Sequence, residues 1–506
     1  MKRLSLLAAS VLAVVPVSAH AFCGFYVAGG GAELFNNATQ VVLMRQGTRT
    51  VLSMQNNYQG PPSDFAMVIP VPVVLQKENV KTLNKAIFEK VDKLGAPRLV
   101  EYWEQDPCPR PQRFYPDEAV RAAPMRAKAG APVMEKADRE YGVTVEAKFE
   151  VGEYEIVVLS AKDALGLEDW LKDNRYKIPA GAEALFRPYI QQGLKFFVAK
   201  VDSKKVTFVD GQATLSPLRF HYDSEKFFLP VRLGLINAKD KQDLIVSILA
   251  RNQRYEVANF PNVTIPTNID LVPSAKNEFG PFYASLMDKT LKKTPGAVVT
   301  EYAWDSGTCD PCPTPALNQQ DLMILGLDVI DGDVVMPEVS VTNMDKLAPE
   351  DQQIVTATIE NMKRQIQHRK MRGGARFVLT RLHARYDKKS LGEDLVFSAA
   401  QPIVGGREFL KDGQNLEQGA VASTVNNFQA RYAIRYPWTG PIACANPRRG
   451  VWGGPPNGEY SRPTAATDTP FVKRDEALVS ALAESPVEEL GVKGKKARAG
   501  IPGKGK

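Results

Sequence analysis

The sequence is organised around two related stretches, AIFEKVDKLGAPRLVEYWEQDPCP at residues 86–109 and SLMDKTLKKTPGAVVTEYAWDSGTCDPCP at residues 285–313. Each has a helical pattern, a Pro or Gly break, a β-type run, the dipeptide Glu-Tyr and the tetrapeptide Asp-Pro-Cys-Pro. The second copy has four additional loop residues, one of which is Cys309. Because an ordered match of this kind indicates a duplicated supersecondary unit, we expect Cys108 and Cys312 to occupy equivalent positions in two weakly related halves.

The rest of the chain is dominated by patterns that are typical of strands. Alternating runs on either side of Gln46-Gly47 and of Gly152 predict two hairpins. Helical patterns are fewer, and the clearest cover residues 81–94 and 349–371. The sequence therefore predicts an α+β fold, mainly antiparallel β-sheet with a few packed helices.

Shifts in composition divide the chain into six parts. The predicted parts are a signal peptide at 1–21, a β-rich module with helix 81–94 and the first Asp-Pro-Cys-Pro loop at 22–115, a flexible linker at 116–140, a central α+β module at 141–260, a module with the second loop and helix 349–371 at 261–450, and a Pro/Gly-rich, basic and largely disordered tail at 451–506. The linker and the tail are assigned because they lack apolar periodicity.

The first 21 residues have the pattern of a secretory signal peptide. Lys2 and Arg3 precede an apolar run at 4–17, and Ala-His-Ala at 19–21 is a typical cleavage site. We expect cleavage after Ala21, a mature protein that begins at Phe22, and a periplasmic or secreted location. No later segment offers about 20 uninterrupted apolar residues, so no transmembrane helix is expected in the mature chain.

The net charge of +7 is concentrated at the two ends of the chain. The leader carries two basic residues, and the tail from Gly491 carries six basic residues and no acids; taking these eight charges from +7 leaves −1 for residues 22–490. A nearly neutral body gives no electrostatic signature of nucleic-acid binding. The basic tail is a candidate contact for anionic surfaces.

The five cysteines are candidates for disulfides because the chain is predicted to be exported; they are Cys23, Cys108, Cys309, Cys312 and Cys444. A thioredoxin-type redox site would need Cys309-Asp-Pro-Cys312 at the start of a helix, where prolines follow instead. A zinc site would need two more nearby ligands, and the histidines are scattered. We predict a Cys309–Cys312 disulfide and a bond from Cys108 to Cys23 or Cys444, which leaves one free thiol.

Catalytic signals are weak. The chain contains no H-E-x-x-H, G-x-S-x-G or P-loop motif. Glu101 and Glu301 lie at equivalent points of the two copies, and a pair of carboxylates could act in a hydrolase. Carboxylates on a strand face are usually solvated, however. No catalytic, cofactor-binding or metal-ligating residue is therefore assigned, and no cofactor is expected.

The chain resembles a bacterial family known as domain of unknown function 2330. The resemblance rests on NYQGPPSDFAMVIPVP, LGAPRLVEYWEQDPC, DALGLEDWLKDNRYKIP, FRPYIQQGLKFFVAKV, LSPLRFHYDSEKFFLPVRLGL, AWDSGTCDPCP, FVLTRLHARYDKKSLGEDLVF and RYAIRYPWTGPIAC. It implies an exported, cysteine-containing envelope or secreted protein, and it supplies no activity, substrate or site residue. Relatives often end in an apolar anchor, where this chain has its basic tail.

Three functions are left open by these patterns. The leading hypothesis is a non-enzymatic binding or structural module of the cell envelope, with an unknown envelope or extracellular partner. The first alternative is an exported hydrolase that uses carboxylates near Glu101 and Glu301. The second is a periplasmic thiol–disulfide protein that uses Cys309 and Cys312. A hydrolase needs polar residues that converge in one pocket, and a redox protein needs an exposed Cys309 at a helix start.

Overall fold

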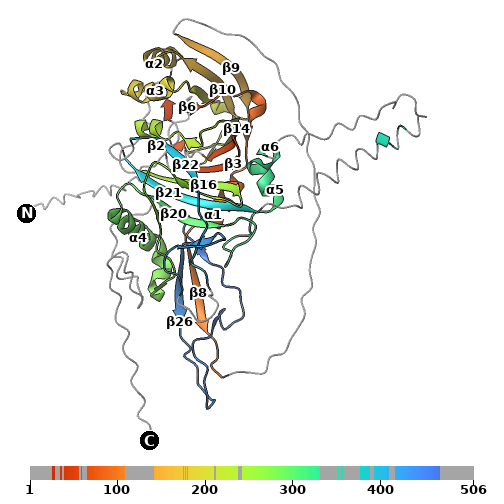
Figure 1. The fold of residues 1–506 in the computed structure, drawn as a ribbon, viewed down its shortest axis with the longest axis vertical. Helices are drawn as coiled ribbons and strands as arrows, with labels where there is room; N and C mark the ends of the chain where they lie inside the picture. The colour runs from red at the N-terminus through yellow and green to blue at the C-terminus, as the bar shows by residue number, and fades with distance from the viewer. Residues whose placement is uncertain are drawn as a thin grey trace, which may run out of the picture.

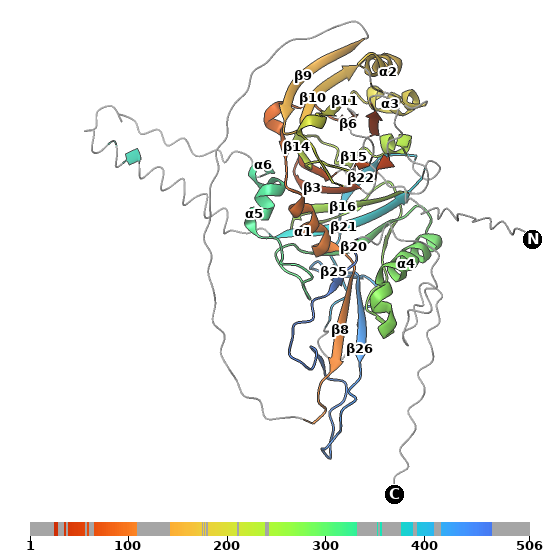
Figure 2. The same cartoon turned by 180° about the vertical axis from the view of Figure 1, so that it is seen from behind.

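The computed structural model of the chain describes nine main segments and a few short pieces. The segments are 39–55, 65–108, 142–174, 181–209, 212–237, 242–330, 376–387, 392–408 and 416–467, and the pieces are 25–28, 35–36, 58–59, 176, 178, 352 and 355–356. The fold is α+β, as predicted, with strands in antiparallel and mixed sheets and a small number of helices. A large sheet crosses the middle of the molecule, with α2 and α3 beyond it at one end and β8 and β26 at the other (Figures 1 and 2).

The largest sheet has eleven strands in the order β24-β23-β25-β20-β21-β16-β3-β4-β14-β7, with β18 paired to β20. Their bounds are β3 (Thr39–Gln46), β4 (Arg49–Gln55), β7 (Val80–Thr82), β14 (Leu218–Asp223), β16 (Gln242–Arg251), β18 (Asn262–Thr264), β20 (Val298–Asp305), β21 (Phe377–Tyr386), β23 (Ile403–Gly405), β24 (Val421–Ala422) and β25 (Asn427–Gln429). Most neighbours are antiparallel, whereas β16 runs parallel to β3. The centre of the sheet, β16 and β21, is buried.

A second sheet packs on one face of the first. It has the order β1-β6-β11-β10-β9, from β1 (Phe25–Ala28), β6 (Phe65–Val71), β9 (Val143–Val151), β10 (Tyr154–Ala161) and β11 (Lys195–Val201). Residues alternate between its faces: Phe197 and Ala199 contact the large sheet, whereas Phe196 and Val198 contact α2 (Ala164–Asp173) and α3 (Ala182–Gln191). Two helices and two sheets therefore form stacked layers.

The opposite face of the large sheet is covered by α1 (Lys85–Gly95). Its apolar stripe includes Ile87, Phe88 and Val91, which pack against Met44 and Leu379 of the sheet. The same cluster takes in residues of α5 (Gln319–Leu322), η5 (Met323–Leu327) and α6 (Asp328–Ile330).

A third sheet forms the lower part of Figure 1. It has the order β19-β26-β8-β27, with β28 also paired to β8, and its strands are β8 (Arg98–Glu104), β19 (Ile269–Leu271), β26 (Arg431–Tyr436), β27 (Trp452–Gly453) and β28 (Thr464–Ala465). The helix α4 (Phe279–Lys293) packs here through Phe279, Phe282 and Leu286. Parallel pairing of β8 with β26 joins residues that are more than 300 positions apart in the sequence.

Two smaller sheets complete the fold. One has the order β12-β13-β5-β2, from β2 (Phe35–Asn36), β5 (Tyr58–Gln59), β12 (Thr207–Val209) and β13 (Gln212–Thr214). The other has the order β15-β22-β17, from β15 (Phe228–Leu229), β17 (Arg254–Val257) and β22 (Leu395–Ala400). Short 3₁₀ turns η1 (Lys77–Asn79), η2 (Ser203–Lys205), η3 (Arg232–Asn237) and η4 (Pro273–Glu278) connect the elements.

Both predicted hairpins are present. β3 pairs with β4 about Gly47, and β9 pairs with β10 about Gly152; both glycines have a positive φ that suits a tight turn. The two Asp-Pro-Cys-Pro copies also have the predicted order, since α1 precedes β8 and α4 precedes β20. Their strands differ in sheet partners, because β8 belongs to the third sheet and β20 to the largest.

Several predicted boundaries differ from the structure. The helix predicted at 81–94 begins only at Lys85, because Val80–Thr82 pairs with β14 and Asn84 caps the helix by accepting from the Ala86 amide. The large sheet contains strands from 22–115, 141–260 and 261–450, so these modules do not correspond to separate sheets. The tail predicted from 451 is ordered as far as β27 and β28, which pair with β8.

Other predictions lie outside the described residues. These are the signal peptide at 1–21, the linker at 116–140, the basic end of the tail and most of helix 349–371, of which residues 352, 355 and 356 are helical. Among the helices that the structure does describe, none has both the length and the apolar content needed to cross a bilayer.

Two glycines with positive φ provide a matched test of packing. Gly326 (φ +140°) lies against β4, and a Cβ there would be 2.8 Å from both methyl groups of Val51. Gly47 (φ +55°) has nothing within 4 Å of that position. We expect Gly47→Ala to lower the free energy of unfolding by about 1 kcal/mol through backbone conformation alone. Gly326→Ala should lower it by about 2–4 kcal/mol, since overpacking adds about 1–3 kcal/mol. Urea unfolding measures both, and equal losses would contradict the predicted overlap with Val51.

Candidate functional site

The two glutamates singled out from the sequence lie in different environments. Glu101, on β8, accepts from the Tyr436 hydroxyl at 2.8 Å and pairs with Lys276 at 2.8 Å. Glu301, on β20, is 1% exposed and belongs to a cluster of charged side chains on the face of the large sheet that α1 covers. The expectation that strand carboxylates are solvated is therefore wrong for Glu301. A hydrolase with a pair of catalytic carboxylates would need the two glutamates side by side. In the described chain, Glu101 and Glu301 lie on strands of different sheets and share no interaction.

The charged cluster is centred on β21, which carries Arg381, His383 and Arg385 on one face. His383 Nδ1 lies 2.7 Å from Glu301 Oε1, and its Nε2 lies 2.9 Å from Asp243 Oδ1. Arg381 Nε donates to Glu301 Oε2 at 2.6 Å, and Arg385 Nε donates to Asp243 Oδ1 at 2.6 Å. These contacts connect the three central strands β16, β20 and β21.

Two helices are tied to the same cluster. Arg381 also pairs with Asp92 of α1, and Arg385 pairs with Asp288 of α4. The Tyr283 hydroxyl of α4 donates to Glu301. Glu301 is the extra residue of a β-bulge in β20, where the register shifts between Thr300 and Tyr302. A bulge re-aims side chains locally, which explains how this glutamate meets both Arg381 and His383.

The geometry fixes the protonation of His383. Both of its ring nitrogens face carboxylates, which can only accept hydrogen bonds, so both nitrogens must donate and the side chain is an imidazolium. Burial alone would lower the pKa of His383, but the charges of Glu301 and Asp243 and their hydrogen bonds raise it. Burial alone would raise the pKa of Glu301, but His383 and Arg381 lower it to about 2. Each ion is thus held in its charged form by its neighbours.

The cluster was missed from the sequence, although a signal for it exists. Phe377, Leu379, Arg381, His383 and Arg385 alternate along one β-type run, FVLTRLHARY. Such a run predicts a strand with one apolar and one solvated face, but every residue of β21 is buried. Basic residues at alternate positions of a strand whose other residues are mostly apolar can therefore indicate buried ion pairs.

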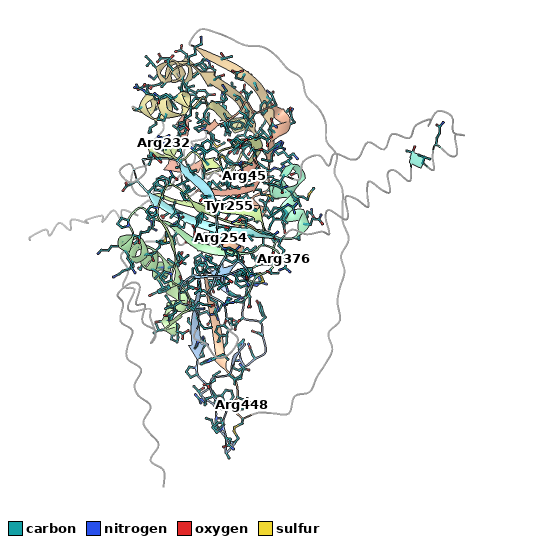
Figure 3. All side chains as sticks on the ribbon, viewed as in Figure 1. Arg45, Arg232, Arg254, Tyr255, Arg376 and Arg448 are labelled. Atoms are coloured by element: carbon teal, nitrogen blue, oxygen red, sulfur yellow. A yellow bond between two sulfur atoms is a disulfide. The ribbon has the colours of Figure 1, made fainter. Side chains whose placement is uncertain are left out.

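The cysteines form two disulfides in the described chain. Cys309 is bonded to Cys312, as predicted from the sequence, and Cys108 is bonded to Cys444, which is one of its two predicted partners. Cys23 lies outside the described residues. The Cys108–Cys444 bond spans 336 positions and lies at the tip below β8 and β26, where the Arg448 amide donates to Pro107 O at 2.8 Å (Figure 3).

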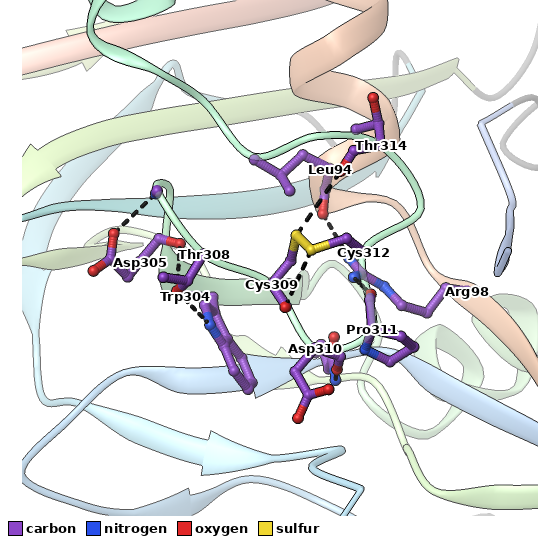
Figure 4. The surroundings of a disulfide bond; sticks show 12 residues. Leu94, Arg98, Trp304, Asp305, Thr308, Cys309, Asp310, Pro311, Cys312 and Thr314 are labelled. Atoms are coloured by element: carbon purple, nitrogen blue, oxygen red, sulfur yellow. Dashed lines mark hydrogen bonds between the residues drawn. A yellow bond between two sulfur atoms is a disulfide. The ribbon is translucent and has the colours of Figure 1, made fainter. Parts of the chain in front are cut away.

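The Cys309–Cys312 loop is held by local contacts rather than by a helix. The Trp304 indole donates to Thr308 Oγ1 at 3.1 Å, and the Gly307 amide donates to Asp305 Oδ1 at 2.9 Å (Figure 4). Arg98 Nη1 donates to Pro311 O at 3.0 Å. No helix begins at Cys309, so the arrangement lacks the helix N-terminus that stabilises the thiolate of a thioredoxin-type site.

The two Glu-Tyr dipeptides share two contacts, although the environments of their glutamates differ. The Tyr102 ring is covered by Arg431, and the Tyr302 ring is covered by Arg98, each with the guanidinium carbon 5.2 Å from the ring centre. Each preceding glutamate accepts from a tyrosine hydroxyl, Tyr436 or Tyr283. The duplicated sequence thus corresponds to a duplicated set of contacts, although the disulfide partners differ.

A pocket of about 580 Å³ lies on the third sheet, beside Tyr102. It is lined by Tyr102, Glu408, Leu416, Arg431, Arg435, Gly450, Val451 and Trp452. Arg431 is 1% exposed; its Nη1 donates to Asn268 Oδ1 at 2.7 Å and its Nη2 donates to the Tyr102 hydroxyl. Its Nε has no hydrogen-bond partner. The pocket therefore combines aromatic rings with convergent charged groups, which is typical of ligand sites.

A second pocket of about 440 Å³ lies between α4 and the loop that precedes β24. It is lined by Glu256, Asn262, Val263, Thr264, Pro266, Thr290, Lys293, Thr294, Gly419 and Ala420. Neither Glu101 nor Glu301 lines either pocket. Within the described residues, no group of three or more His, Cys, Asp or Glu side chains is arranged to hold a metal ion.

The imidazolium of His383 predicts a pH dependence of stability. Because the pKa of His383 is raised in the folded state, its contribution is fully present below about pH 6.5, the ordinary histidine value, and is lost as pH rises through the folded pKa. Urea unfolding from pH 5 to 9 should show this loss in the natural protein and not in His383→Gln. His221→Gln is the control, since burial lowers the pKa of His221 and its effect has the opposite sign. Parallel alkaline losses in all three proteins would contradict the assignment.

A glutamine substitution at each glutamate separates the two environments. Glu301→Gln would leave the charges of Arg381 and His383 short of a partner, and we expect a loss of about 3–5 kcal/mol in the free energy of unfolding. Glu101→Gln breaks a pair whose lysine is half exposed, and should cost less than about 1 kcal/mol. Urea unfolding at pH 6 provides the comparison. If Glu301→Gln lowers the free energy of unfolding only slightly, the charged cluster does not hold α1 and α4 to the sheet.

Comparison with known proteins identifies the family. The family model of DUF2330, described as an uncharacterized protein conserved in bacteria, matches residues 17–398, well over half of the chain. No curated protein and no solved structure matches the chain. The matched part includes both Glu-Tyr dipeptides and the charged cluster, whereas Arg431, Arg435 and Trp452 lie beyond its end. The chain belongs to the bacterial DUF2330 family.

Proposed function

We propose that this protein is exported to the bacterial cell envelope, where it acts as a non-enzymatic binding or structural module. The proposal rests on the difference between the charged residues of the central cluster and those that line the pocket beside Tyr102. The buried carboxylates and bases of the charged cluster are all engaged with one another, as in a structural network. In the pocket beside Tyr102, by contrast, two arginines, a glutamate and two aromatic rings converge on open space.

Two features support export. The leader at 1–21 has the three-part pattern of a secretory signal. The two disulfides of the described chain support this location, because disulfides persist mainly in oxidising compartments such as the periplasm. The long-range bond between Cys108 and Cys444 constrains the unfolded chain over a large loop, which is the kind of disulfide that adds most to the stability of an exported protein.

The two catalytic alternatives receive less support. A hydrolase needs a carboxylate that can reach a substrate, but Glu301 is buried in ion pairs and Glu101 is held by Lys276 and Tyr436. A thiol–disulfide protein needs an activated Cys309, and this residue lies in a half-buried loop that is followed by prolines.

Cell fractionation tests the proposal. When the full chain is produced in a bacterial host, we expect the mature protein outside the cytoplasm, with Phe22 at its N-terminus by Edman sequencing. The purified mature protein should then sediment with isolated envelopes. In the control, with cytoplasmic extract from which vesicles have been removed, it should stay in the supernatant. A product that retains Met1 would contradict export, and a mature protein that never sediments with envelopes would contradict the binding role.

A further inference from the structure

Arg431 differs from Arg381, Arg385 and Arg98, which are also deeply buried, in how its charge is compensated. Arg381 and Arg385 pair with carboxylates, and Arg98 donates to Leu94 O and Ala96 O at the C-terminal end of α1, where the helix dipole favours a cation. In the described part of the chain, the side chain of Arg431 has only a neutral amide and a tyrosine hydroxyl as its hydrogen-bond partners, and its buried Nε, like that of Arg98, has none. A buried cation whose direct partners are all neutral is only partly compensated, so an anion bound beside Arg431 would be stabilised.

A second guanidinium completes the cationic wall of the pocket. Arg435 Nε donates to Asp270 at 3.1 Å, which holds the side chain in place. Its guanidinium carbon lies 5.5 Å from the centre of the Tyr102 ring and 5.2 Å from that of Trp452. Within the described residues, neither Nη atom of Arg435 donates a hydrogen bond. A fixed planar fork with free donors is suited to bidentate binding of a carboxylate.

The remaining polar group of the pocket is an acceptor. Glu408 lines the pocket, and its negative charge adds to the effect of burial, which raises the pKa of Tyr102 to about 12. A carboxylate at this place accepts hydrogen bonds from hydroxyl groups, and its charge disfavours a dianion such as phosphate. Trp452 adds an aromatic surface, against which the C–H groups of a sugar ring can pack.

We propose that the pocket of Tyr102, Glu408, Arg431, Arg435 and Trp452 binds an acidic sugar, with the sugar carboxylate on the two arginines and its hydroxyl groups on Glu408. The pocket volume of about 580 Å³ suits one or two sugar rings. This inference names the ligand class of the proposed binding role and rests on it.

Saturation-transfer NMR on the mature protein tests the ligand class, with glucuronate, glucose and inorganic phosphate as probes. We expect binding of glucuronate, and at least tenfold weaker binding of glucose, which lacks the carboxylate. Arg435→Gln should weaken glucuronate binding at least tenfold, the effect of losing one charge-assisted contact. Arg435→Lys keeps the charge without the fork and should lie between the two. Arg187→Gln, which removes an exposed arginine on α3, is the matched control and should bind as the natural protein does.

The assignment would be overturned by no transfer to glucuronate, by equal binding of glucose, or by unchanged binding of glucuronate to Arg435→Gln. Displacement of glucuronate by an equal concentration of phosphate would also overturn it, since it would show a general anion site. Circular dichroism establishes that each variant is folded. Sedimentation with envelopes separates the two proposals: if the mature protein sediments but glucuronate does not bind, the ligand class is wrong and the envelope-binding role stands.

Discussion

The imidazolium of His383, held between Glu301 and Asp243, is the contact on which the arrangement of the central elements depends. It connects β16, β20 and β21, and the flanking Arg381 and Arg385 extend the network to α1 and α4. Removing such ions from water costs several kcal/mol each, and the cost is offset only when every partner is in place. The network therefore favours one register of β21. A shift by a single residue would turn its three bases towards the apolar side that holds Leu382, Ala384 and Tyr386.

The buried arginines show how the same residue type serves different purposes. Where carboxylates surround the guanidinium, as at Arg381, the side chain fixes the relative positions of strands and helices. Where helix carbonyls accept from it, as at Arg98, it links the end of α1 to the loop of Cys309 and Cys312. At Arg431 the partners are neutral and the side chain lines a pocket. This difference in compensation distinguishes the arginines of the central ion-pair network from Arg431, which lines the pocket at the lower end of the molecule.

Local features were predictable from the sequence, and non-local ones were not. The hairpins at Gly47 and Gly152 follow from alternation and from the turn residues themselves. The start of α1 was placed too early because Val80–Thr82 is drawn into a strand by β14, which is distant in sequence. The burial of Glu301 depends on bases in β21 that lie 80 or more positions away, and the two-residue strands near Trp452 and Thr464 exist only as partners of β8. The pocket likewise unites residues from four separate segments, so no single window of sequence could reveal it.

The same two strands, β8 and β26, carry the pocket residues and lead to the long-range disulfide. β8 carries Tyr102 and leads to Cys108, and β26 carries Arg431 and Arg435 and leads to Cys444. The two strands run parallel and are joined by the disulfide beyond the same ends. Parallel strands from opposite ends of a chain have no short connection to fix their separation, and a covalent bond at the tip supplies that restraint. The first Asp-Pro-Cys-Pro copy thus fastens the strands that bear the pocket, whereas the second copy, with Cys309 as its own partner, closes only a local loop. The spacing of Tyr102 from the two arginines is thus restrained by a disulfide, and because disulfides persist in oxidising compartments, the predicted export of this protein would preserve the geometry of the pocket.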